Sequence, residues 1–104
     1  MRRAAKVDGN QGRIVKALEA IGCTVHSLAA VGEGCPDIVV GYHGHNYLLE
    51  IKDPDQPPSK RALTPAQVVW HDSWRGQVAV VETVEEAIEA IAMDMTKPPR
   101  GTRR

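Results

Sequence analysis

Cysteine, long apolar runs and net charge are the three features that this 104-residue sequence has little of. Its two cysteines, Cys23 and Cys35, are too few for a disulfide scaffold, and no CxxC pair offers a zinc site. We interpret both as small buried or half-buried thiols. No apolar run approaches the roughly 18 residues that cross a bilayer, and the first residues lack the apolar stretch of a signal peptide. We therefore expect one cytoplasmic domain with no membrane contact.

The formal net charge of zero conceals an uneven distribution of charge. Residues 1–6 hold three basic side chains and residues 97–104 hold four, without any acid, whereas the remainder holds 6 basic against 13 acidic residues. This pattern suits a basic arm over 1–9, a single domain over 10–95 and a basic tail over 96–104. Basic ends bind phosphate groups readily, and an acidic body can supply carboxylates to a site. The alternative is that both ends are simply disordered and solvated.

Hydrophobic periodicity and turn signals predict the element order α-β-β-β-α-β-α. Thr64, Pro65 and Gln67 have the form of a helix start, with Thr64 as N-cap, Pro65 at the first position and Gln67 completing a capping box. A second capping box, Thr83 with Glu86, is expected to open the last helix, whose apolar stripe is Ala87, Ile88, Ile91 and Met95. The polar, proline-rich stretch 53–62 is expected to be a flexible loop. The other expected elements are a helix over 10–21, strands over 23–28, 37–42 and 47–52, a helix over 65–74 and a buried strand over 77–81.

The strands at 37–42 and 47–52 are joined by a short polar link, which predicts an antiparallel hairpin. If its turn is tight and centred on His43 and Gly44, Asp37 lies across from Glu50, with Cβ atoms about 4.5 to 5.5 Å apart. A bulge would change this register.

This hairpin would bring together the residues best suited to chemistry. Glu50 and Lys52 project to the same face of their strand because side chains alternate, so Ile51 points into the core. Two converging carboxylates, Asp37 and Glu50, can bind a hard cation such as Mg²⁺, with waters, the Ile51 carbonyl and a substrate phosphate completing the octahedron. With Lys52 beside it, such a site can activate water and neutralise charge on a phosphodiester. Either motif alone is an ordinary surface feature; together they predict hydrolysis of nucleic acid.

These motifs resemble a known family. Gly34-Cys35-Pro36-Asp37 followed by Leu49-Glu50-Ile51-Lys52 resembles the PD-(D/E)XK nuclease signature, and the segment 63–67 with the strand after it is similar to the VRR-NUC group. That group includes stand-alone virus-type and Holliday-junction resolvase-like members. The resemblance spans about 8–91. It implies a small αβββαβα restriction-endonuclease-like fold, an α/β structure with a mixed central sheet flanked by helices.

The resemblance also implies roles for individual residues. Asp37 and Glu50 match the metal-binding acids, Lys52 the catalytic lysine, and Gln67 a glutamine near the active site, although Gln67 is equally explained as the partner of Thr64. Many members add a Glu from the first helix. Here Asp8 is the nearest acid, next to the neutral Asn10 and Gln11, which leaves the identity of that ligand open.

The leading hypothesis is an Mg²⁺- or Mn²⁺-dependent endodeoxyribonuclease, specific for Holliday junctions or other branched DNA and active as a homodimer, because two symmetric cuts need two subunits. The cofactor would be the metal alone, and a phage or prophage origin would place the protein in the host cytoplasm. The alternative is a catalytically weak or inactive DNA-binding accessory protein of the same fold. A third, a small interaction module without a nucleic-acid role, is supported only by the acidic body. The residues expected to contact DNA are Arg2, Arg3, Lys6, Lys60 and Arg61, the last two also being consistent with a solvated loop.

Overall fold

Eight elements form a sheet with helices beside it. The structure, a computed structural model, describes residues 9–96, with side chains through residue 92. Within these residues no helix combines the length and the apolar character needed to span a membrane. In chain order the elements are α1 (Gln11–Ala20), β1 (Thr24–Ser27), β2 (Ile38–Tyr42), β3 (His45–Ile51), α2 (Pro58–Arg61), α3 (Pro65–Ser73), β4 (Ala79–Val81) and α4 (Val84–Thr96).

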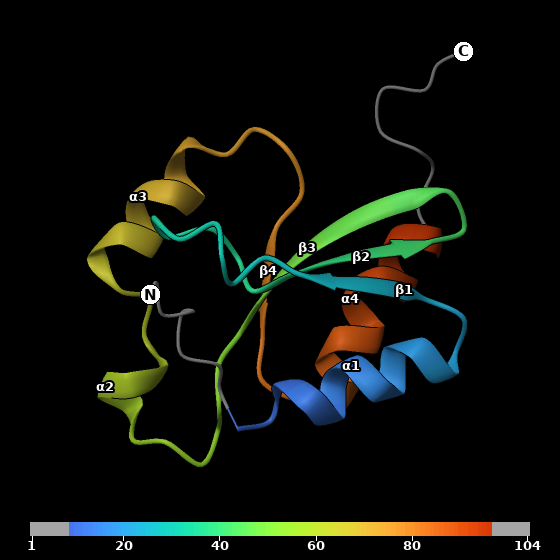
Figure 1. Ribbon diagram of the computed structural model, residues 1–104, viewed down its shortest axis with the longest axis horizontal. Helices are drawn as coiled ribbons and strands as arrows, with labels where there is room; N and C mark the ends of the chain where they lie inside the picture. Colours follow the sequence, from blue (N-terminus) through green and yellow to red (C-terminus); the bar gives the residue numbers. More distant parts are fainter. Residues whose placement is uncertain (1–8, 97–104) are drawn as a thin grey trace.

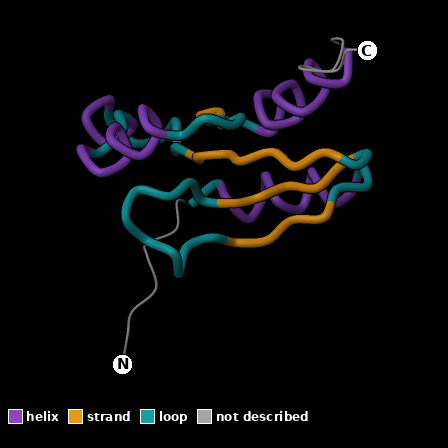
Figure 2. The backbone as a smooth tube through the Cα atoms, turned by 90° about the horizontal axis from the view of Figure 1, so that it is seen from above, coloured by secondary structure: helices purple, strands orange, loops and turns teal. Residues whose placement is uncertain are grey.

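The four strands form one mixed sheet in the order β1-β2-β3-β4. The pairs β1–β2 and β2–β3 are antiparallel, and β3–β4 is parallel. Figure 1 shows α1 and α4 side by side against the sheet. Helices α2 and α3 lie beyond the end of the sheet where β2 begins and β3 ends, and the view in Figure 2 agrees. The expected α/β fold with a mixed sheet and flanking helices is confirmed.

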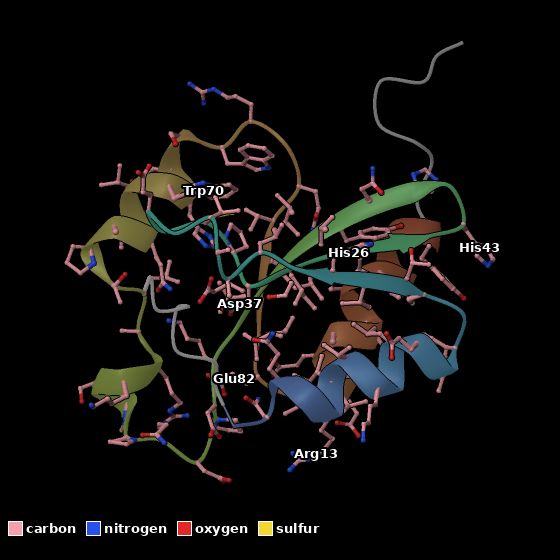
Figure 3. All side chains as sticks on the ribbon, viewed as in Figure 1. Arg13, His26, Asp37, His43, Trp70 and Glu82 are labelled. Atoms are coloured by element: carbon pink, nitrogen blue, oxygen red, sulfur yellow. The ribbon has the colours of Figure 1, made fainter. Side chains whose placement is uncertain are left out.

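The β2–β3 hairpin has the register that the sequence predicted. Ile38 pairs with Leu49 and Tyr42 with His45, leaving a two-residue turn. That turn has positive φ at both positions, 50° at His43 and 80° at Gly44, which is the type I′ geometry that matches strand twist. The tip with His43 lies at the opposite end of the hairpin from Asp37 (Figure 3).

The core lies between the sheet and the pair α1 and α4. Alternate residues of each strand point toward these helices, and the stripe of α1 and the first part of the α4 stripe face them. Met95, the last residue of the expected stripe, has its side chain outside the described part. The buried apolar residues are Ile14, Leu18, Cys23, Ile38, Val40, Tyr47, Leu49, Ile51, Val81, Ala87 and Ile91.

The start of α3 is as expected. Thr64 Oγ1 accepts the Gln67 N–H at 3.2 Å, Gln67 Oε1 accepts the Thr64 N–H at 2.9 Å, and Pro65 follows the cap.

Only one of the two hydrogen bonds expected for the second capping box, at the start of α4, is present. Thr83 Oγ1 accepts the Glu86 N–H at 3.0 Å, but the Glu86 carboxylate accepts the N–H of Glu82, one residue upstream of the cap.

The stretch expected to be a flexible loop contains helix α2. The Asp53 side chain accepts the Asp55 N–H at 2.9 Å, and the Pro57 carbonyl accepts the Lys60 N–H at 2.8 Å. The prolines that indicated a loop also favour a helix start, because Pro58 stands at its first turn, where no N–H is needed.

The last strand is shorter and less buried than expected. β4 begins at Ala79, and Val80 is 44% exposed. Val80 pairs with Glu50, so both face away from the core helices. Before β4 starts, the side-chain amide of Gln77 takes the place of a backbone partner for Leu48 of β3. Its Oε1 accepts the Leu48 N–H at 2.7 Å, and its Nε2 donates to the Leu48 carbonyl at 3.3 Å.

Candidate active site

Two carboxylates meet where β2 begins and β3 ends. The ladder continues beyond β2, because the Asp37 N–H donates to the Leu49 carbonyl at 3.1 Å, and this places Asp37 opposite Glu50. The Asp37 side chain then accepts the N–H of Ile51 at 2.6 Å. In Figure 3 Asp37 lies between the sheet and α3. The structure thus places Asp37, just before β2, opposite Glu50 of β3, as the hairpin register required.

Glu50 is in an environment that disfavours its charge. Its side chain is almost fully buried, and burial is the largest cause that raises its pKa, from 4.5 to about 7. The charge of Asp37 raises this pKa further, and Lys52 lowers it in part. The two carboxyl groups are close enough to share a proton by hydrogen bonding. Near neutral pH Glu50 is therefore protonated in part, and a bound cation could replace that proton.

Lys52 is buried beside Glu50. Only 6% of the residue is exposed, and its Nζ lies 3.5 Å from Glu50 Oε2. The same ammonium donates a 2.8 Å hydrogen bond to Gln67 Oε1. A buried ammonium is stable only with such partners, so the cation is held in one place at the site.

Gln67 connects α3 to both of these groups. Its Nε2 donates to Glu50 Oε2 at 2.9 Å, while its Oε1 accepts from Lys52 and from the Thr64 backbone. Gln67 therefore makes the cap contact and also contacts Lys52 and Glu50, two of the residues expected at the site. The capping box fixes the side chain in the orientation that reaches the site.

The donor set fits a hard divalent cation. Glu50 Oε1 is buried and has no hydrogen-bond partner in the described part of the chain, and it belongs to a pair of facing carboxylates. Oxygen ligands of this kind suit Mg²⁺ or Mn²⁺. Within residues 9–96, no group of three or more His, Cys, Asp or Glu side chains could hold a metal. Further ligands would have to come from carbonyls such as that of Ile51, from water or from substrate; Asp8 lies outside the described residues.

The start of α1 adds a contact that the sequence did not reveal. Asn10 Nδ2 donates to the Lys52 carbonyl at 3.1 Å and to the Glu82 carbonyl at 2.8 Å, which ties the ends of β3 and β4 together. Asn10 and Gln11 are both buried, and their side-chain oxygens have no hydrogen-bond partner among the residues that the structure describes. Asn before an amphipathic helix is expected at an exposed cap, so the sequence held no signal of this burial.

Two more groups lie near the site. The pKa of the half-buried Cys35 thiol is raised by burial and then by the charges of Glu50 and Asp37. The pKa of His71 on α3 is lowered by burial and by the charge of Lys52. Cys35 was interpreted from the sequence as a buried or half-buried thiol, and only the fold brings it beside the carboxylates and brings His71 near Lys52.

The structure describes two of the five residues expected to contact DNA, Lys60 and Arg61. Lys60 is exposed on α2. Arg61 forms a partly exposed ion pair with Glu82, in which Arg61 Nη1 lies 3.8 Å from Glu82 Oε1. Arg2, Arg3 and Lys6 lie outside the described residues. The rings of Trp70 on α3 and of Trp74, the residue that caps the end of this helix, stack with their centroids 4.6 Å apart.

The described residues form an α/β domain with paired acids and a lysine at the end of a mixed sheet. No family model matches the sequence, and no curated protein matches it significantly. A solved structure described as "VRR_NUC domain" is similar, with a TM-score of 0.58 and 27% sequence identity over 82% of this chain and 97% of that chain. The chain therefore has a VRR_NUC-type nuclease fold, which confirms the resemblance seen in the sequence motifs.

Proposed function

We propose that the protein is a metal-dependent endodeoxyribonuclease that cleaves branched DNA. The observation that carries this proposal is the pair of the half-buried Asp37 and the buried Glu50, with Lys52 Nζ 3.5 Å from Glu50 Oε2, on a nuclease fold. A buried ion cluster costs free energy that a hydrophobic cluster would not, and such perturbed groups gather at functional sites.

Each residue has a part in the proposed hydrolysis. Asp37 and Glu50 would hold Mg²⁺ or Mn²⁺, with the Ile51 carbonyl and Asp8 as the further ligands that the sequence predicts. The bound cation supplies water activation and charge neutralisation at the phosphodiester. Lys52 donates hydrogen bonds to the phosphate oxygens on which negative charge builds. Gln67 holds both Lys52 and Glu50 in the orientation that this requires.

The DNA would extend beyond the site over basic residues. Lys60 and Arg61 on α2, together with Arg2, Arg3 and Lys6 of the arm 1–9, would contact phosphates. A domain spanning 10–95 is too small to surround a four-way junction, so we propose a homodimer whose two sites cut symmetrically.

The test is a cleavage assay with labelled four-way junction, flap and linear duplex DNA in Mg²⁺, Mn²⁺ or EDTA. We expect paired, symmetric cuts in the junction with either metal and none in EDTA. Equal cutting of all three substrates would reject the specificity for branched DNA. Metal-independent cutting would reject the mechanism.

A second candidate is an accessory protein that binds DNA without cutting it. It is favoured because, within residues 9–96, no group of three or more His, Cys, Asp or Glu side chains could hold a metal. Calorimetric titration with Mn²⁺ separates the two: the nuclease requires a saturable site that is lost in Glu50→Gln, and the accessory protein requires none.

A further inference from the structure

The loop between β1 and β2 touches the first turn of α3 at Gly34. A Cβ placed on Gly34 would overlap the carbonyl oxygen of Ala66 and lie 2.7 Å from its carbonyl carbon and 3.0 Å from the Gln67 nitrogen. Real Cβ atoms do not approach backbone this closely, so the loop and the helix meet backbone to backbone. Figure 1 shows this loop extending from the sheet to α3.

This contact links two sides of the site. Gly34 is three residues before Asp37 in the same loop, and Ala66 is adjacent to Gln67 in α3. Glu50 interacts with Asp37 at the end of this loop and with Gln67 on α3. The distance between loop and helix therefore sets how Asp37 and Gln67 are spaced around Glu50.

Close approach, and not backbone conformation alone, requires glycine here. Gly32, Glu33 and Gly34 have φ values of 73°, 59° and 84°, all in the left-handed region. Glu33 shows that a side chain is tolerated in this conformation within the same loop. A Cβ on Gly32 would meet nothing within 4 Å. Gly34 differs from Gly32 because the backbone of α3 lies directly against it.

We propose that Gly34 is a positioning residue that sets the depth at which α3 inserts Gln67 between Lys52 and Glu50. A side chain at 34 would push the first turn of α3 outward and lengthen hydrogen bonds that now measure 2.8 and 2.9 Å. Displacements of about 1 Å at a catalytic site can cost about 100-fold in rate. The consequence for catalysis rests on the proposed nuclease function, whereas the placement of Gln67 does not.

The experiment compares Gly34→Ala with Gly32→Ala, since both put a Cβ on a left-handed backbone and only the first meets α3. The side-chain amide resonance of Gln67, assigned from Gln67→Ala, is recorded by ¹⁵N NMR without DNA or metal. Cleavage is then measured with Mn²⁺ in both single variants, in Gln67→Ala and in Gly34→Ala combined with Gln67→Ala.

We expect the Gln67 amide resonance to move toward that of an unbonded amide in Gly34→Ala and to stay in place in Gly32→Ala. The kcat should fall about 10-fold or more in Gly34→Ala at unchanged KM, and by less than about twofold in Gly32→Ala. In the Gln67→Ala background, Gly34→Ala should cause no further loss, because both changes remove the same contacts.

Three results would overturn the proposal: the same Gln67 resonance in both glycine variants, an additive loss in the double variant, or unfolding of Gly34→Ala while Gly32→Ala stays folded. The last result would make the contact a general folding contact. A wild-type protein that cleaves no DNA in any metal would reject the proposed function, and the NMR comparison would still decide the role of Gly34.

Discussion

Gln67 Nε2 donates a 2.9 Å hydrogen bond to Glu50 Oε2, which joins the first turn of a helix to the end of a buried strand. Because the other end of the same amide accepts from Lys52 and from the backbone of Thr64, one side chain both caps α3 and orders the site. The residue that caps α3 is thus also the one that contacts Lys52 and Glu50 at the proposed site.

Removing the Gln67 amide should therefore affect rate more than stability. We expect Gln67→Ala to lower kcat for DNA cleavage by about 10- to 100-fold, because Lys52 and Glu50 lose their common partner. Its cost in unfolding free energy should be only about 0.5–2 kcal/mol, the usual range for a cap. The control is Thr64→Ala, which removes the cap hydroxyl and leaves the amide contacts. Similar rates for the two variants at similar stability would show that Gln67 acts only as a cap.

Stability should fall as pH rises between about 4.5 and about 7. In this window the folded protein keeps the proton of Glu50, whose pKa is raised to about 7, and the unfolded chain loses it. The folded state binds more protons, so the free energy of unfolding decreases with pH, by at most about 1.4 kcal/mol per unit from this group. Denaturant unfolding of wild type and Glu50→Gln, without metal, measures the difference. We expect Glu50→Gln to be the more stable protein above pH 7; a constant difference across this range would contradict the raised pKa.

Divalent metal should stabilise the folded protein through Asp37. A cation that binds only the folded state adds about 2.7 kcal/mol at one hundred times its Kd. We expect Mn²⁺ to raise the thermal midpoint of wild type and to have little effect on Asp37→Asn. Asp72→Asn, which changes an exposed acid on α3, is the matched control and should respond like wild type. Equal stabilisation of Asp37→Asn would remove this carboxylate from the metal site.

Asn10 should contribute to stability and to the position of Lys52. In Asn10→Ala two backbone carbonyls, those of Lys52 and Glu82, lose their side-chain donor, and a buried unsatisfied group costs about 1–3 kcal/mol. We expect a loss in that range by urea unfolding. The control is Gln11→Ala, since no hydrogen bond to these two carbonyls comes from Gln11 in the described contacts. A cost for Asn10→Ala below about 0.5 kcal/mol would show that the strand ends hold together without it.

The sequence predicted the hairpin and its two acids because local chemistry determines them. The two-residue turn at His43 and Gly44 fixes the register, and the register places Asp37 opposite Glu50. The start of α3 was predictable for the same reason, since Thr64, Pro65 and Gln67 are neighbours in the chain.

Features that depend on packing between distant segments were not predictable. The exposure of Val80 depends on which face of the sheet the helices cover, and the burial of Asn10 depends on where the ends of β3 and β4 lie. The close approach at Gly34 also involves Ala66 of α3, 32 residues further along the chain, so the sequence indicated only a turn at this glycine.

The most direct test of the proposed active site is the rate of junction cleavage in Mg²⁺ by Lys52→Ala, with Lys16→Ala as a control that removes an exposed lysine of α1. Loss of a positioned charge that acts on the reacting phosphate typically costs about 100-fold or more in kcat. We predict such a loss in Lys52→Ala, with DNA binding retained, and wild-type cleavage by Lys16→Ala. Full activity of a folded Lys52→Ala protein would contradict the assignment of this site.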